Sequence, residues 1–274
     1  MSSRCRDRRF RALACTVLGV LLATTACARS LRVCADPDNL PYSDVAERGF
    51  ENRLARLIAK DLDADLSYYW LPQWRGFTRK TLLEGNCDVI PGVPVDSANV
   101  RVTKPYYRGA YALVFRTDRV PGLSGLDDAR LRTLRIGVPL VGIDAAPTPP
   151  GRALARRAIY DNVVGFPVVG DKPAAERMFA ALATDAIDVA VVWSPQAGYY
   201  MAREHAPLSI VLLEPEERDP RFEFAIAMAV RPDDAALQHA LDASLARLQP
   251  QIEAVLREYG VVQHDDDVTL GGQR

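Results

Sequence analysis

The chain has 274 residues, of which 49% are hydrophobic, and it carries 34 basic and 35 acidic residues. This composition is sufficient for one large or two medium globular units. A net charge near zero favours neither a nucleic acid nor an anionic surface as a partner.

The N-terminal residues have the pattern of a secretory signal peptide. Arginines between positions 4 and 11 precede an apolar stretch, Leu13–Ala23, that is too short to span a bilayer. Ala26-Cys27-Ala28 then offers a small-residue cleavage site, so residues 1–28 are predicted to direct the chain to the periplasm. The alternatives are a membrane anchor, a lipoprotein signal acylated at Cys27 and a twin-arginine signal at DRRFRAL. No later segment is long and apolar enough to insert into a membrane after cleavage.

Strand and helix periodicities alternate through the first third of the mature region. They predict a strand at 31–36, a helix at 50–62, a strand at 66–70, a short helix at 77–83 and a strand at 87–92. This βαβαβ order calls for a parallel sheet with right-handed crossovers.

The alternation restarts after a turn-rich segment. Further strands are predicted at 111–117, 134–140, 163–169, 187–193, 208–214 and 222–230, with helices near 152–159, 178–182 and 197–204. A C-terminal helix, 237–256, is expected to break at Pro250.

The order of these elements predicts an α/β protein of two lobes. Residues 29–112 and 231–262 would form lobe 1, residues 113–230 would form lobe 2 with the two hinge strands, and residues 263–274 would be a polar tail. Hinged closure over a ligand is the usual consequence of such a plan. The alternative is a single elongated sheet of Rossmann-like type.

Two stretches of the chain match each other, Gly85–Asp96 (GNCDVIPGVPVD) and Thr184–Pro195 (TDAIDVAVVWSP). In each, a helix leads into an Asp and an apolar strand, and the strand stops at a Pro-containing loop. Ligands of parallel α/β sheets bind outside the carboxyl ends of the strands. The chain is therefore expected to present two strand ends to one cleft, one from each lobe.

Only Cys34 and Cys87 of the five cysteines remain after the predicted signal peptide. They lie in the first strand and at the start of the third, which are neighbours in a doubly wound lobe. A disulfide between them is expected in an oxidising periplasm. The alternative is two buried free thiols.

Catalytic and metal-binding motifs are absent from the sequence. It contains no GxSxG, HExxH, P-loop or GxGxxG pattern, and its three histidines are scattered. We therefore predict a binding protein with no catalytic residues, no metal site and no cofactor.

The order of the segments resembles that of the family-3 extracellular solute-binding proteins, which have the two-lobed type II periplasmic binding fold with two hinge strands. The resemblance rests on the opening strand, CDVIPG, VTKPYY and DVAVVWSP. In amino-acid-binding members, an Arg holds the ligand carboxylate and an acidic residue holds the ligand amine. The corresponding positions here are near Asp96 and at Trp193, so a free amino acid is not expected as the ligand.

A narrower resemblance covers RVCADPDNLPYS, GFENRLARLIAKDL, WLPQWRGFTRKTL and DVAVVWSPQAGYY. These segments are similar to the quinoprotein-dehydrogenase-associated solute-binding-like proteins, the MoxJ/XoxJ group. The resemblance implies a periplasmic accessory protein that binds a PQQ-dependent methanol or alcohol dehydrogenase and assists its activation or maturation.

Aromatic and polar side chains are predicted to gather at the strand ends and form the cleft, where they suit a ring-like ligand or an inserted peptide. The predicted cleft residues are Asp36, Asn39, Tyr42, Trp74, Arg75, Pro94, Asp96, Tyr106, Asp144, Trp193 and Ser194. Trp193 is the foremost candidate, with packing at the hinge as its alternative role, and Asp36 is alternatively a turn former. An ABC-transporter receptor for a small solute is the alternative function. An enzyme of the dehydratase type would need acidic residues paired in the cleft.

Overall fold

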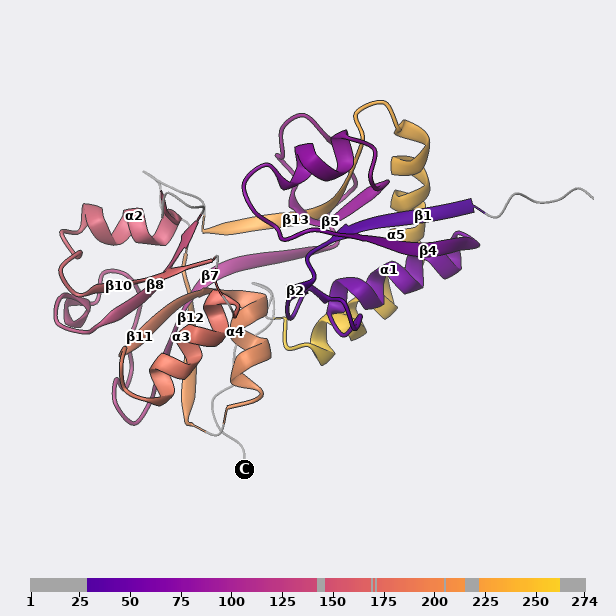
Figure 1. Cartoon of the computed structure of the whole chain (residues 1–274). Helices are drawn as coiled ribbons and strands as arrows, with labels where there is room; N and C mark the ends of the chain where they lie inside the picture. The colour runs from indigo at the N-terminus through magenta and orange to yellow at the C-terminus, as the bar shows by residue number, and fades with distance from the viewer. Residues whose placement is uncertain are drawn as a thin grey trace, which may run out of the picture.

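The computed structural model describes residues 29–141, 146–168, 170, 172–204, 206–214 and 222–261. The predicted signal peptide (1–28) and polar tail (263–274) lie outside the described residues, as does Asp144. The chain forms two α/β lobes joined by two long strands, β7 (Tyr107–Arg116) and β13 (Glu223–Val230) (Figure 1). The predicted two-lobed architecture is thereby confirmed.

Lobe 1 is built on a parallel sheet in which β1 lies between β4 and β5, as the βαβαβ pattern predicts. Its elements are β1 (Arg29–Ala35), β2 (Asp38–Asn39), β3 (Ser43–Asp44), α1 (Phe50–Asp61), β4 (Ala64–Trp70), the one-turn η1 (Arg79–Leu83), β5 (Val89–Pro94), β6 (Arg101–Val102) and α5 (Ala235–Glu258). Helix α1 begins where Asn52 accepts a hydrogen bond from the Gly49 amide, and its apolar face, with Phe50 and Leu54, is buried.

Lobe 2 repeats this plan with the parallel order β10-β8-β11. Its elements are η2 (Ala129–Arg132), β8 (Ile136–Val141), β9 (Ala146–Pro147), α2 (Pro149–Arg156), β10 (Val163–Pro167), α3 (Ala174–Ala183), β11 (Val189–Trp193), α4 (Ser194–Met201) and β12 (Leu208–Leu212). Buried residues line both faces of this sheet, with Phe115 and Leu154 on one side and Phe179 and Val192 on the other.

Strands β7 and β13 connect the lobes because each of them changes partner along its length. The first half of β7, Tyr107–Ala110, pairs antiparallel with β13, and the second half lies between β11 and β12. Strand β13 in turn pairs with β5 through its second half. The hydrogen-bond ladder is therefore continuous across the molecule, while the buried cores of the two lobes are separate.

The sequence repeat is also a structural repeat. In lobe 1, Asp88 accepts hydrogen bonds from the backbone and side chain of Arg32, and its own amide donates to the Arg32 carbonyl at 2.8 Å. In lobe 2, Asp188 makes the same set of contacts with Arg135, again with an amide-to-carbonyl distance of 2.8 Å. Each Asp therefore anchors the start of the strand that ends at the cleft, β5 in lobe 1 and β11 in lobe 2.

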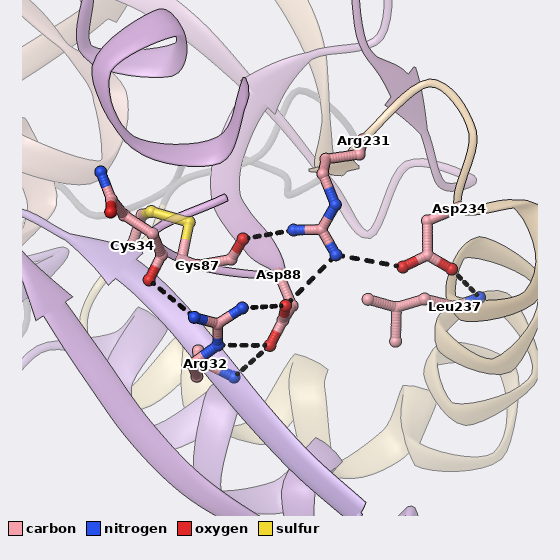
Figure 2. Close-up of polar contacts among 8 residues, drawn as sticks. Arg32, Cys34, Cys87, Asp88, Arg231, Asp234 and Leu237 are labelled. Atoms are coloured by element: carbon pink, nitrogen blue, oxygen red, sulfur yellow. Dashed lines mark hydrogen bonds and ion pairs between the residues drawn. A yellow bond between two sulfur atoms is a disulfide. The ribbon is translucent and has the colours of Figure 1, made fainter. Parts of the chain in front are cut away.

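Asp88 has a second partner that Asp188 lacks among the described residues. Arg231, at the end of β13, lies 3.3 Å from Asp88 Oδ1 and donates to the Cys87 carbonyl at 2.6 Å (Figure 2). The predicted disulfide between Cys34 and Cys87 is present beside this cluster, with its Cα atoms 5.5 Å apart. Arg32, Asp88 and Arg231 thereby link β1 and the start of β5 to the segment that leads into α5.

The C-terminal helix differs from the prediction. Helix α5 continues through Pro250 without a break. A proline removes one backbone donor and crowds the preceding turn. Here Leu248 and Ile252, on either side of it, are buried in the core of lobe 1, and this packing keeps the helix continuous.

Candidate functional site

The cleft contains two adjoining cavities between the lobes. The inner one, called here the aromatic chamber, has a volume of about 330 Å³. It is lined by Tyr42, Glu51, Gln73, Gly92, Pro94, Tyr107, Tyr111, Trp193, Phe224 and Ile226. These residues come from lobe 1, from both crossing strands and from the carboxyl end of β11, so both lobes contribute to one site.

Trp193 closes the chamber from lobe 2. Its ring lies against Gly109, where a Cβ would approach the indole to 2.4 Å, so only glycine fits at this point of β7. Its ring centroid lies 5.2 Å from that of Tyr111 and 5.7 Å from that of Phe224. Trp193 therefore has two roles: it packs on the crossing strands, and it lines the chamber.

Glu51 brings a carboxyl group into the chamber from the first turn of α1. The residue is 8% exposed, and burial raises the pKa of its carboxyl to about 8. The hydroxyl groups of Tyr42, Tyr106 and Tyr107 lie around it, and burial raises the pKa of each well above its ordinary value. These tyrosines are therefore neutral neighbours of Glu51 at every physiological pH.

The second cavity, called here the outer groove, has a volume of about 390 Å³ and shares Tyr42 and Gln73 with the chamber. Its lobe 1 wall is Asp36–Asn39, Tyr42 and Pro72–Trp74; its lobe 2 wall is Pro139, Val141, Val168, Gly170, Lys172–Ala175, Met178 and Gln196. Trp74 is 56% exposed, and Val141 and Val168 opposite it are 49% and 40% exposed. Apolar surface thus faces the groove from both lobes.

Asp36 has its carboxylate occupied by the backbone around it. Its oxygens accept hydrogen bonds from the Asp38 amide at 2.9 Å and the Gln73 amide at 2.6 Å. Asn39 donates to the Gln73 side chain at 3.4 Å. Asp36 therefore shapes the rim of the outer groove as a turn former, which was its alternative role.

The other predicted cleft residues are placed in three ways. Tyr42, Pro94 and Trp193 line the chamber, and Asp36, Asn39 and Trp74 line the groove. Tyr106 and Ser194 lie behind the chamber wall: the Tyr106 hydroxyl accepts from the Gly92 amide at 3.1 Å, and the buried Ser194 hydroxyl accepts from the Ala110 amide at 3.2 Å. Arg75 and Asp96 are exposed and line neither cavity.

Of the residues that line the chamber, the sequence reasoning assigned only Tyr42, Pro94 and Trp193 to the cleft; those it missed include Glu51, Tyr107, Tyr111 and Phe224. The tyrosines and Phe224 lie in the crossing strands, where period-two alternation suggested a buried sheet rather than a ligand wall. A signal was available for Tyr107, which directly follows Tyr106 in the PYY segment. None was available for Glu51, because an acidic residue in a first helical turn is ordinarily a favourable surface charge.

Within the described residues, no group of three His, Cys, Asp or Glu side chains could hold a metal ion. None of the helices described in the structure is long and apolar enough to cross a membrane.

Comparison with known proteins identifies the family. No protein-family model matches the chain. Over 253 residues, it is 31% identical to Protein MoxJ of Methylorubrum extorquens, covering 85% of this chain and 81% of that protein.

Two solved structures have the same fold. The periplasmic binding protein XoxJ from Methylobacterium extorquens matches with a TM-score of 0.71 and 36% identity, over 85% of this chain and 98% of that one. MxaJ from Methlophaga aminisulfidivorans matches with a TM-score of 0.76 and 26% identity, over 85% of this chain and 100% of that one. These matches confirm the periplasmic binding protein fold and the predicted resemblance. The chain belongs to the MoxJ family of solute-binding-like proteins.

Proposed function

We propose that this protein is a periplasmic accessory protein of a PQQ-dependent methanol or alcohol dehydrogenase. In this proposal, residues 1–28 direct export, residues 29–112 and 231–262 form lobe 1, and residues 113–230 form lobe 2 with the crossing strands. The cleft between them binds a segment of the dehydrogenase and assists its activation or maturation.

The shape and polarity of the cleft carry this proposal. The outer groove places the exposed apolar side chains of Trp74, Val141 and Val168 opposite one another, and it leads into the aromatic chamber. Exposed apolar surface of this kind marks interaction sites. A peptide segment would lie along the groove and insert one side chain into the chamber, as aromatic pockets accept anchor residues at protein interfaces.

The chamber also differs from an amino-acid site. No Arg or Lys lines it among the described residues, so a ligand carboxylate would find no cationic partner there. Trp193 occupies the strand end where the amino-acid-binding members of the fold carry an acidic residue. Together with the membership of the MoxJ family, this favours a protein partner over a transported amino acid.

A second candidate function is that of an ABC-transporter receptor for a small solute other than an amino acid. The observation that favours it is the volume of the chamber, about 330 Å³, which is in the range of pockets that hold small molecules. It predicts that one small solute raises the melting temperature of the protein, since a ligand that binds only the folded state stabilises it by mass action.

The accessory function can be tested with a matched pair of variants. Trp74→Ser removes an aromatic side chain, 56% exposed, from the outer groove, whereas Tyr160→Ser removes one, 60% exposed, that lines neither cavity. Biolayer interferometry against the purified dehydrogenase should show at least tenfold weaker binding for Trp74→Ser and unchanged binding for Tyr160→Ser. Equal binding of the two variants would remove the groove from the interface.

A further inference from the structure

Glu51 has a polar side chain for which the fold itself gives no partner. It is 8% exposed and lines the aromatic chamber. Among the described residues, no hydrogen bond or ion pair reaches its carboxyl group, and desolvation alone accounts for its shifted pKa. The capping of α1 does not need it either, because the Asn52 side chain accepts the Gly49 and Asp44 amides.

The fold nevertheless reserves space for this carboxyl group. A Cβ at Gly92 would lie 2.3 Å from Glu51 Oε1, so a glycine on β5 admits the carboxyl to the chamber wall. A buried acidic group without a partner destabilises the protein when it is ionised. Such a group is therefore a candidate for an interaction that a ligand completes.

The walls of the chamber indicate the charge of that ligand. The rings of Tyr111, Trp193 and Phe224 form one continuous surface, and Tyr42 and Tyr107 complete the enclosure. The faces of aromatic rings attract cations, most strongly where water is excluded. An anion would find no Arg or Lys among the lining residues, and an apolar neutral ligand would leave the carboxyl group unpaired.

We propose that the aromatic chamber binds an organic ammonium group, with the carboxylate of Glu51 as its counter-ion and the rings of Trp193 and Tyr107 as its walls. The ammonium group has two sources with the same chemistry: a free small amine, or a lysine side chain of the bound dehydrogenase segment. The second source rests on the proposed function, whereas the first does not.

Binding is coupled to a proton in this proposal. Burial raises the pKa of Glu51 to about 8, so the empty chamber holds a protonated carboxyl at neutral pH, and an ammonium ion expels that proton. The ionisable groups that face Glu51 are the hydroxyls of Tyr42, Tyr68, Tyr106 and Tyr107, whose raised pKa values keep them neutral. Its other neighbours, on β1, β5, β13 and α5, are apolar.

The free-amine arm of the test uses isothermal titration calorimetry at pH 7 with n-butylammonium and choline as probes. The uncharged control is 3,3-dimethylbutan-1-ol, which has the shape of choline. Choline should bind at least tenfold more tightly than the alcohol and should release a proton, detected as a heat that depends on the ionisation enthalpy of the buffer. Glu51→Gln should abolish both effects, while Glu47→Gln, a carboxylate paired with Arg56 outside the chamber, should leave them unchanged.

The second arm measures the binding of Glu51→Gln and Glu47→Gln to the dehydrogenase by biolayer interferometry. If free amines do not bind but Glu51→Gln weakens dehydrogenase binding at least tenfold, the ammonium group belongs to the protein segment. If amines bind and the wild-type protein does not bind the dehydrogenase, the chamber proposal stands and the accessory function fails. The proposal is overturned if amines bind no better than the alcohol and Glu51→Gln binds the dehydrogenase as the wild type does.

Discussion

The carboxyl group of Glu51 lies against the backbone of Gly92, in the space that any other side chain at position 92 would fill. Gly92 has a φ of 73°, which is disfavoured for residues with a Cβ, and a Cβ there would also displace the Glu51 carboxyl group. Helix α1 and strand β5 meet at this contact, and it brings an ionisable group into the aromatic chamber without a partner from the fold. The acid–base behaviour of the protein follows from this arrangement.

Glu51 should make the stability of the protein fall as the pH rises from about 4.5 to about 8. Its pKa is raised from 4.5 to about 8 in the folded state, so over this interval the unfolded chain loses a proton that the folded chain retains. The free energy of unfolding should decrease by an amount on the order of 4 kcal/mol and then level off above pH 8. Urea unfolding at pH 5 and pH 8.5 measures this decrease. Glu51→Gln should remove it, and parallel curves for the variant and the wild type would contradict the assignment.

The disulfide between Cys34 and Cys87 should stabilise the folded protein by about 4 kcal/mol, because it closes a loop with a sequence separation of 53 residues in the unfolded chain. The double variant Cys34→Ala, Cys87→Ala should unfold at a correspondingly lower urea concentration. Reduction of the wild type should move its unfolding midpoint toward that of the double variant. Coincident curves for the oxidised wild type and the double variant would show that the bond contributes nothing.

Asp88 and Asp188, which occupy equivalent positions in the two lobes, should contribute unequally to the stability of the protein. The Asp88 side chain is 14% exposed and is bound by Arg32 and Arg231, whereas that of Asp188 is 24% exposed and is bound by Arg135. Asp88→Asn should lower the free energy of unfolding by about 2–3 kcal/mol and Asp188→Asn by about 1 kcal/mol, after allowance for solvent screening.

The pH dependence of these ion pairs has the opposite sign to that of Glu51. Burial raises the pKa of Asp88, but the hydrogen bonds from Arg32 outweigh burial and lower it overall; the hydrogen bond from Arg135 lowers the pKa of Asp188. Their contributions are present above the ordinary pKa of 3.8 and are lost as the pH falls below it. Each asparagine variant should therefore lose less stability than the wild type in that acidic range. If Asp188→Asn lowers the free energy of unfolding at pH 7 more than Asp88→Asn does, the predicted order of the two contributions is wrong.

Gly198 forms a close contact between the lobes. It lies on α4, and a Cβ there would come within 1.6 Å of the carbonyl oxygen of Gly260, just after α5. Gly198→Ala should force the two helices apart and destabilise the protein by about 1–3 kcal/mol, as overpacked sites do. Small-angle scattering should detect a larger radius of gyration. Gly151→Ala in α2, where the nearest atom would be 3.3 Å away, is the control and should leave the radius of gyration unchanged.

Trp193 should matter more for binding than for folding. Trp193→Ala removes one wall of the chamber while leaving the hydrogen-bond ladder of β11 in place. Binding to the dehydrogenase should weaken at least tenfold, with a circular dichroism spectrum like that of the wild type. Unchanged affinity in a folded variant would assign Trp193 to hinge packing alone.

The secondary structure and the disulfide could be predicted from the sequence because both depend on local periodicity and on sheet adjacency. The match between the stretches that contain Asp88 and Asp188 correctly indicated two equivalent strands, one in each lobe. Their partners Arg32 and Arg135 could not be found in this way, because they lie 56 and 53 residues away along the chain.

The chamber was only partly predictable, because many of its residues lie far apart along the chain. The strand-end rule located Pro94 and Trp193, but the chamber also depends on β7 and β13, whose residues become neighbours only when the lobes are joined. Pro250 shows the opposite case, in which a strong local signal for a break is overridden by burial of Leu248 and Ile252.

The proposed accessory function requires that the cleft recognise the dehydrogenase. Biolayer interferometry of the purified protein against the proposed partner, a PQQ-dependent methanol dehydrogenase in apo and metal-loaded forms, measures this recognition. We expect micromolar or tighter binding that differs between the two forms and is weakened by Trp193→Ala. Absence of binding to either form would contradict the accessory function and would favour a receptor for a small solute.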